Sequence, residues 1–305
     1  MRLYVIQRGL QVLLVIFLSL NAVFFMTRLA GDPTLLYVPQ NASPAEVAKI
    51  RHELGFDRPL YIQYRDFMKR AVRGDFGQSL RYQEPALPLV LQRFPATAEL
   101  AACAFIFSLL VAIPVGVVGA SRRGSVLDAI GVVSTVIGQA VPGFWLGLIL
   151  IYFLSVKLHL LPTGGYGGFK HFVMPTLTLA AYTTAQFTRL TRSTMIDVLS
   201  EDYVRTARSK GVTDRRALYK HALRNAVIPL ITIAGLQLGR MLGGVVVIET
   251  VFSWPGLGRL IVQALLNRDF TVVLAGVLLT SVTYSVINFI IDLSYGYVDP
   301  RIRYG

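Results

Sequence analysis

The stretch between residues 200 and 226 holds the side chains best arranged for chemistry, and the chemistry that they could do is docking to another protein. Ser200 can cap a helix N-terminus, and Asp202 lies in the first turn, where the helix dipole favours an acidic group. Gly211 is placed to end this helix in a left-handed conformation. Thr213 can cap a second helix directly after the turn. The pattern predicts two short helices joined at a glycine.

Apolar and small residues recur four positions apart on both predicted helices. Tyr203 and Ala207 fall on one face of the first helix, and Leu218 and Ala222 on one face of the second. A helix pair of this kind can lie in a groove on another protein. An ordinary basic loop, kept on one side of a membrane by its charge, is the alternative interpretation.

A second candidate is Arg240, which interrupts an otherwise uncharged stretch and is followed closely by two glycines. A charge inside a membrane span is a functional hypothesis by default. We expect Arg240 to face a translocation path and to meet an anionic group of the solute, such as a peptide carboxylate. A pair with another subunit, or a span boundary shifted past Arg240, would satisfy the same charge.

The sequence holds no motif for catalysis of its own. It lacks the Gly-x-x-x-x-Gly-Lys-Ser/Thr phosphate-binding loop, the zinc-protease helix motif and the Gly-x-Ser-x-Gly elbow. The one cysteine, Cys103, excludes an intramolecular disulfide and a cysteine-based metal site, and we interpret it as a small buried hydrophobe. We therefore expect no enzyme activity, cofactor or metal site in this chain.

The composition is that of a membrane protein. Hydrophobic residues make up 54% of the 305 residues, charged residues make up 15%, and the mean hydropathy is +0.56. A soluble domain usually carries about a quarter charged residues. The net charge of +13 would suggest nucleic acid in a soluble protein. Here the basic residues flank apolar stretches, which indicates a lipid bilayer and argues against nucleic acid.

Six stretches nearly free of Asp, Glu, Lys and Arg predict six transmembrane helices, although the fourth is short. They are residues 9–27, 100–121, 129–156, 172–188, 225–248 and 270–291. Pro142 and Gly143 lie in the middle of the third stretch, where we expect a kink. With both termini in the cytoplasm, the cytoplasmic segments hold fifteen basic residues and the two short outer loops hold four. This distribution follows the positive-inside rule.

The segment 28–95 would then lie outside the cytoplasm and is predicted to be ordered. Ser43 and Glu46 have the spacing of a capping box, at the start of a predicted helix that ends near Gly55. A second helix is predicted over residues 62–72. The segment either contacts a partner or solute, or forms a structural cap over the bundle.

The loop resembles the signature of ABC importer permeases, in which a Glu-Ala-Ala triplet is followed by a glycine and then by an Ile-x-Leu-Pro element. The matching positions are Arg205, Thr206 and Ala207 for the triplet, Gly211 for the glycine, and His221, Ala222, Leu223 and Arg224 for the last element. Arginine replaces both the acid and the final proline, which is similar to the dipeptide/oligopeptide/nickel permease subfamily. The resemblance implies that regions 205–211 and 218–224 couple the chain to an ATPase.

The resemblance to that subfamily covers essentially the whole chain. Short elements match in the right order, among them residues 54–60, 74–79, 253–258 and 299–301. The chain looks like the B-type permease, which implies a type I ABC importer in the bacterial inner membrane. The implied partners are a homologous second permease subunit, two ABC ATPase subunits that bind ATP and Mg, and an extracytoplasmic substrate-binding protein. The implied function is import of dipeptides or oligopeptides; glutathione, opines, sugars and nickel remain open.

The predicted fold is therefore an all-α polytopic membrane protein. We divide it into an N-terminal transmembrane helix at 1–27, an extracytoplasmic segment at 28–95, a permease core at 96–296 that contains the coupling loop 189–225, and a cytoplasmic tail at 297–305. An ion-coupled secondary transporter is the alternative function. The predicted spans contain no central Asp or Glu, which argues against ion coupling.

Overall fold

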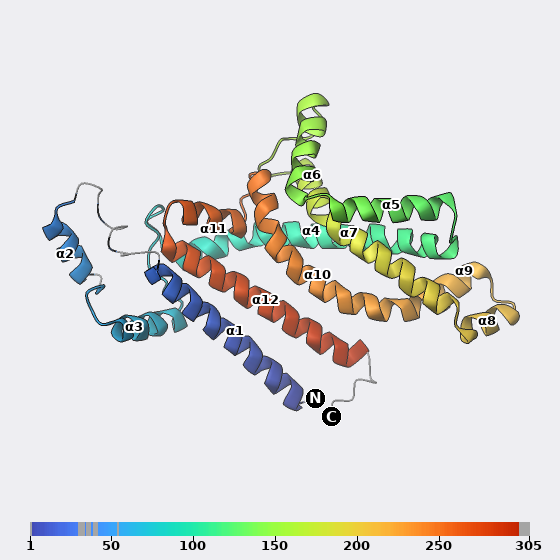
Figure 1. Cartoon of the computed structure of the whole chain (residues 1–305), viewed down its shortest axis with the longest axis horizontal. Helices are drawn as coiled ribbons and strands as arrows, with labels where there is room; N and C mark the ends of the chain where they lie inside the picture. Colours follow the sequence, from blue (N-terminus) through green and yellow to red (C-terminus); the bar gives the residue numbers. More distant parts are fainter. Residues whose placement is uncertain (1, 30–33, 35–37, 39–41, 54, 299–305) are drawn as a thin grey trace. The chain divides into compact units, whose positions relative to one another are not determined.

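A computed structural model describes the chain except for residues 1, 30–33, 35–37, 39–41, 54 and 299–305, and the described part is built of helices (Figure 1). One isolated β-bridge joins Gln78 and Pro85. In chain order the elements are α1 (Arg2–Leu29), α2 (Pro44–Glu53), α3 (Leu60–Val72), α4 (Ala86–Ser121), α5 (Val126–Ala140), α6 (Gly143–Leu150), the π-helical η2 (Ile151–Lys157), α7 (Phe169–Leu199), α8 (Asp202–Ser209), α9 (Asp214–Arg216), the π-helical η3 (Ala217–Ala222), α10 (Leu223–Val251), α11 (Leu257–Leu266) and α12 (Phe270–Val298).

In the part of the chain that the structure describes, four helices are long and apolar enough to cross a membrane: α1, α4, α10 and α12. They contain the first, second, fifth and sixth predicted spans. A fifth candidate is the pair α5 and α6–η2, which is bent by 105°. Pro142 stands at the break as the residue before α6. The kink expected there is thus a full break between two helices.

The fourth predicted span is helical but is not among these candidates. It lies inside α7, whose 31 residues reach about 46 Å at 1.5 Å per residue and so exceed a bilayer core of about 30 Å. Its composition differs, because Thr, Tyr and Gln side chains recur between residues 176 and 188. The all-helical, multi-span prediction is confirmed with four to five candidate spans, and the count of six stays a prediction.

The chain folds into two compact units, and the first contains residues 1–95 and 256–289. α2 begins at Pro44 as predicted, whereas α3 ends at Val72 as predicted but begins at Leu60, two residues before the predicted start. The Ser43 backbone N–H donates to Glu46 at 2.8 Å, the Glu46 N–H donates back to the Ser43 hydroxyl at 3.3 Å, and these contacts hold the pKa of Glu46 below its usual value. Gly55 has a φ of +70° and stands two residues after Glu53, the last residue of α2. The capping box and the helix stop are confirmed.

Aromatic packing and a buried carboxylate hold the first unit together. The Phe24 ring of α1 lies 5.3 Å from the Tyr64 ring of α3, whose hydroxyl donates to Asn21 at 2.9 Å. Asp269 is buried and accepts hydrogen bonds from the hydroxyls of Ser79 at 2.5 Å and Thr271 at 2.8 Å. Such bonds satisfy a carboxylate that would otherwise be costly to bury.

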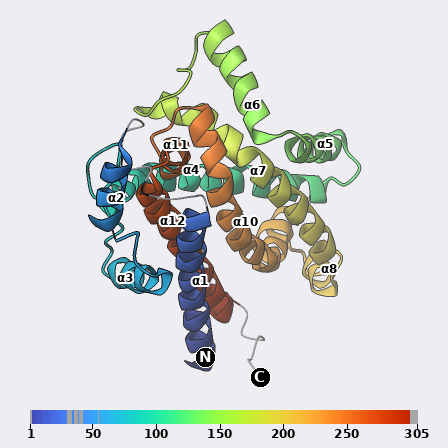
Figure 2. The ribbon, with the colours of Figure 1, turned by 60° about the vertical axis from the view of Figure 1, so that its left-hand side comes forward.

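The second unit contains residues 96–255 and 290–305, and its centre is α7. This helix packs against α5 and α10 (Figures 1 and 2). Small residues allow neighbouring helices to approach α7 closely. A Cβ on Gly138 of α5 would lie 3.1 Å from Ala185, and one on Gly116 of α4 would lie 2.6 Å from Thr191. In the turn after α10, the Trp254 indole is fully buried, and its N–H donates to the Ala96 carbonyl at 2.9 Å.

The expectation of a buried Cys103 is wrong. Its side chain is exposed on α4. An apolar helix in a membrane turns part of its surface outward, so a small hydrophobe inside an apolar run does not have to face the core.

Candidate functional site

The loop after α7 forms the two predicted helices around a glycine. The first is α8, and Gly211 follows it with a φ of +82°, the left-handed conformation expected there. The second helix differs from the prediction in one respect. It continues from α9 through the π-helical turn η3 into α10 without interruption. A displacement of this helix is therefore a displacement of the α10 N-terminus.

Both predicted side-chain caps in this loop are wrong. α7 continues to Leu199, so Ser200 is the C-cap residue of α7, and its hydroxyl donates back to the Asp197 carbonyl at 2.6 Å. Thr213 precedes α9 but accepts no cap hydrogen bond through its side chain. The acidic residues predicted for the helix starts are in place, with Asp202 and Asp214 in the first turns.

The inner face of the loop packs onto the ends of α4 and α7. Val204 and Ala222 are fully buried. Ala222 belongs to a core cluster with Val117 of α4 and Met195 of α7, against which the partly buried Leu218 and Leu223 also pack. A buried contact of this kind transmits displacement, because interiors are close-packed.

A hydrogen bond fastens the first loop helix to the second. The Asn225 side-chain amide of α10 donates to the Tyr203 hydroxyl of α8 at 2.7 Å. The two helices of the loop are thereby tied to each other as well as to the bundle.

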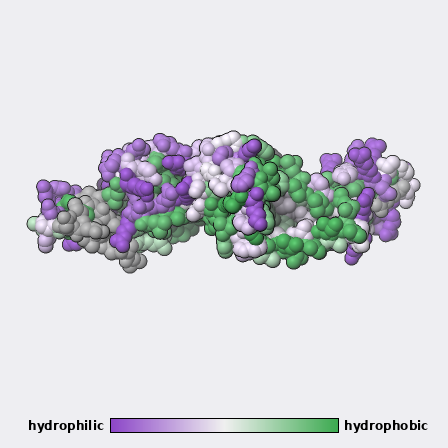
Figure 3. Space-filling view, turned by 90° about the horizontal axis from the view of Figure 1, so that it is seen from above, coloured by the Kyte–Doolittle hydropathy of each residue, from purple (hydrophilic) through white to green (hydrophobic). Residues whose placement is uncertain are grey.

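The outer face of the loop is basic and open. Arg205, Thr206, Gly211 and Arg224 are exposed, and Ala207 and His221 are partly buried. Arg205 lies 3.8 Å from Asp202, but both side chains are at least 80% exposed, so this pair contributes little. Hydrophilic side chains gather over α8 and α9 in Figure 3, beside the hydrophobic surface of the same unit. The nine residues predicted for coupling thus divide into an inner packed face and an outer free face.

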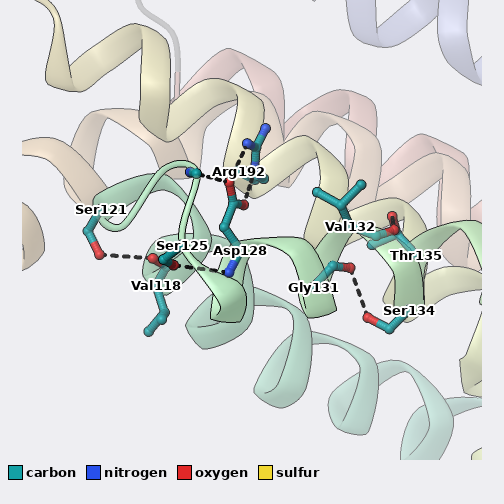
Figure 4. Close-up of polar contacts among 10 residues, drawn as sticks. Val118, Ser121, Ser125, Asp128, Gly131, Val132, Ser134, Thr135 and Arg192 are labelled. Atoms are coloured by element: carbon teal, nitrogen blue, oxygen red, sulfur yellow. Dashed lines mark hydrogen bonds and ion pairs between the residues drawn. The ribbon is translucent and has the colours of Figure 1, made fainter.

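A salt bridge fixes the turn between α4 and α5 beside this loop (Figure 4). Arg192 of α7 binds Asp128 through two nitrogens, at 2.6 Å and 2.8 Å. The Asp128 carboxylate also accepts the Gly124 N–H at 3.0 Å, and the Asp128 N–H donates to the Ser125 hydroxyl at 3.3 Å. The bidentate geometry fixes both the distance and the orientation of the two helices.

Arg240 lies in the middle of α10 with its side chain exposed. It lines a cavity of about 530 Å³ between α6, α7 and α10. The walls are mostly apolar, with Leu179, Phe144 and Val247 among them. The polar residues are Thr178, Tyr182, Thr183, Gln237 and Arg240. A mostly apolar cavity with a few convergent polar groups has the character of a ligand site.

Sequence reasoning missed Tyr182, Gln186 and Gln237, which line or adjoin this cavity. The available signal was the polarity of the fourth predicted span, in which Tyr182 and Gln186 stand four residues apart. Gln237 and Arg240 are three residues apart on α10 and gave the same signal. Polar residues at helical spacing inside a span indicate a face turned away from lipid.

Two family descriptions match the chain. Residues 112–304 match "Binding-protein-dependent transport system inner membrane component", and residues 1–101 match "Binding-prot-dependent transport system membrane comp, N-term". The chain is 40% identical over 302 residues to the "Glutathione transport system permease protein GsiC" of Escherichia coli (strain K12) and to the protein of the same name from Salmonella typhi. Each alignment covers 99% of this chain and 99% of the relative.

Solved structures show the same fold at low identity. A chain of the MetNI methionine ABC transporter in an inward-facing conformation aligns with a TM-score of 0.59 and 19% identity, covering 71% of this chain and 99% of that one. A chain of an amino acid ABC transporter crystallised with histidines aligns with a TM-score of 0.57 and 16% identity, covering 69% and 94%.

Proposed function

Because the chain belongs to the family of binding-protein-dependent transport system inner membrane components, and is thus a non-catalytic ABC importer permease subunit of the bacterial inner membrane, we propose that it forms one half of a solute path. A homologous second permease supplies the other half. ATP and Mg are bound by two partner ATPases, and a substrate-binding protein delivers solute from outside. The observation that carries this proposal is the 40% identity over 99% of the chain.

The proposed solute is a small peptide. The relatives named above are glutathione permeases, and glutathione is itself a peptide with free carboxylates. The polar groups of the Arg240 cavity suit such a solute, because a guanidinium binds carboxylates and the apolar walls accept side chains.

The proposed topology has six spans with both termini in the cytoplasm. Four to five spans follow from length and composition, and α7 supplies a further one. A helix too polar for lipid can still cross a membrane when its polar face lines a water-filled cavity. We keep the division into 1–27, 28–95, 96–296 with the loop 189–225, and 297–305.

Coupling is proposed to pass through the loop in two steps. The exposed face, with Arg205, Thr206 and Arg224, docks into a groove on the ATPase. The packed face, with Leu218 and Ala222, then carries the motion into α4, α7 and α10. ATP binding in the partner displaces the loop, and the spans rock between outward and inward openings.

Arg240 is proposed to meet the anionic group of the solute in the path. The test is uptake of radiolabelled glutathione in cells with Arg240→Gln, with Lys170→Gln as the control that removes an exposed positive charge elsewhere. We expect the Arg240 variant to lose most uptake and the control to retain it. Unchanged uptake in the Arg240 variant would show that Arg240 does not bind the anionic group of the solute.

An ion-coupled secondary transporter was the alternative, and family membership favours the ATP-driven importer. The discriminating experiment replaces the phosphate-binding-loop lysine of the partner ATPase and follows glutathione uptake. The proposal expects uptake to be abolished by this change and to survive collapse of the ion gradients while ATP is maintained. Uptake that follows the ion gradient instead would overturn it.

A further inference from the structure

One face of α7 carries polar side chains in a helical repeat. Tyr182, Gln186 and Arg189 are four and three positions apart, a spacing that places them on one face. The Gln186 amide nitrogen donates to the Tyr182 hydroxyl at 3.0 Å, and the Arg189 guanidinium donates to the Gln186 carbonyl oxygen at 3.3 Å. Tyr182 and Arg189 are exposed. We name these three residues the α7 polar stripe. Lipid cannot satisfy such groups, so the stripe must face water or protein.

The stripe connects two cavities, and each cavity has an arginine. Tyr182 lines the Arg240 cavity described above. Arg189 lines a second cavity of about 510 Å³ between α4, α5 and α7, together with Gln139 and Arg192. The charge of Arg192 is balanced by Asp128, whereas no described carboxylate lies within ion-pair distance of Arg189 or Arg240. Each cavity therefore has one positive charge, on Arg240 in the first and on Arg189 in the second, that no carboxylate of its lining neutralises.

The first cavity also presents a buried acceptor that lacks a donor. Gln237 is 3% exposed and lines the cavity beside Arg240. Its side-chain carbonyl oxygen accepts no hydrogen bond from any residue that the structure describes. Buried amide oxygens are rarely left unpaired, because the desolvation cost is then uncompensated. A turn of the Gln237 side chain toward the cavity would let this oxygen accept a hydrogen bond from a solute N–H group.

We propose that the α7 polar stripe is the solute-facing surface of the path, and that Arg240 and Arg189 make it selective for anionic solutes that carry N–H donors. This inference deepens the proposed function and rests on it. Arg240 and Gln237 hold a carboxylate and an N–H group in the first cavity. Arg189 attracts the anion into the second cavity, and the hydrogen-bonded Tyr182 and Gln186 lie between the two. Small peptides with a free carboxylate match both requirements.

Charge-selective labelling of single cysteines tests the inference without knowledge of the solute. Cys103 is the one cysteine of the chain, so Cys103→Ser provides a clean background. Tyr182→Cys then reports on the first cavity. Gln186→Cys reports from the edge of the second cavity, because the Gln186 amide nitrogen lies 3.5 Å from the side-chain oxygen of Gln139, which lines that cavity. The assembled complex is labelled with an anionic sulfonate thiosulfonate reagent or with a cationic trimethylammonium one. The rate of anionic labelling is divided by the rate of cationic labelling, and this ratio is divided by the same ratio for a small thiol in solution. The result measures the electrostatic potential at the cysteine.

Replacing the arginines should lower this ratio at the matching reporter. Arg240→Gln should reduce the anion-to-cation ratio at residue 182 by about twofold, as expected for one unit charge acting across about one Debye length, about 8 Å, of water. Arg189→Gln should reduce the ratio at residue 186 by at least as much, because the Arg189 guanidinium lies 3.3 Å from the Gln186 side chain. Lys170→Gln is the control on the same helix. It lies about 18 Å from residue 182 along α7, beyond a Debye length of about 8 Å, and should leave both ratios unchanged.

The outcomes separate the inference from the proposed function. Equal ratios in the arginine variants and the control would overturn the inference, as would a failure of both reagents to reach residues 182 and 186. In either case a complex that still contains the ATPase and the second permease leaves the proposed function intact. If those subunits do not purify with the chain, the proposed function fails, whatever the labelling ratio.

Discussion

The salt bridge between Asp128 and Arg192 should be a strong link between the α4–α5 turn and α7, and a double-mutant cycle can measure its strength. The Asp128 side chain is 6% exposed and that of Arg192 is 28% exposed. Removing one partner of a buried pair typically costs about 3–5 kcal/mol, because the other charge stays buried. Arg192 keeps some access to water, so we expect Asp128→Ala to cost about 2–3 kcal/mol of unfolding free energy.

The assay is denaturant unfolding of the purified chain in detergent for Asp128→Ala, Arg192→Ala and the double variant. The double variant should lose little more unfolding free energy than either single variant, because it leaves no unpaired charge buried in the protein. We expect a coupling energy of at least about 1.5 kcal/mol. Arg122→Ala is the control, because it removes an exposed charge from the same turn and should change stability by less than about 0.5 kcal/mol.

Additive single effects would refute this reasoning. They would mean that Asp128 acts through its cap of Gly124 alone, at 3.0 Å, and that Arg192 adds no stability.

Further predictions concern the loop, the helix contacts and the outer segment. Gly211→Val should uncouple ATP hydrolysis from uptake, because a β-branched residue is strained at φ +82°, whereas Gly211→Asn should keep coupling; equal uptake in both variants would contradict this. Gly138→Leu should prevent assembly of a stable chain, because even a Cβ at that position lies 3.1 Å from Ala185; retained thermal stability in detergent would argue against the α5–α7 contact. Ser43→Ala should speed amide exchange at the start of α2 above pH 4.5, the ordinary pKa of Glu46. That effect should fade as the pH falls through the lowered pKa, because the protonated carboxyl no longer favours the contact; an effect independent of pH would exclude the Glu46 contribution.

Helices with strong local signals were predictable from the sequence. The capping box at Ser43 and Glu46, the stop at Gly55 and the left-handed Gly211 each depend on residues within four positions of one another. The apolar spans in α1, α4, α10 and α12 followed from hydropathy alone. Such features need no knowledge of tertiary contacts.

Features that depend on distant contacts were not predictable in the same way. Ser200 had the residue type of an N-cap, but the continuation of α7 to Leu199 made it a C-terminal residue of that helix. The 105° break near Pro142 exceeds the kink that a proline alone implies.

The cavity around Arg240 likewise depends on contacts between residues that are distant in the sequence. One charge in the fifth span was visible in the sequence, but its neighbours Tyr182 and Thr183 come from another helix. Only the packing of α7 against α10 brings them together. The burial and open acceptor of Gln237 likewise depend on that packing.

If the loop 189–225 of this importer permease docks an ATPase, the chain should keep that partner through purification. The most direct test is gentle detergent purification of the chain from its native membrane, followed by mass spectrometry of the proteins that accompany it. The account predicts a homologous permease and a protein with a phosphate-binding loop in stoichiometric amounts. A chain that purifies alone, or only with copies of itself, would contradict the account.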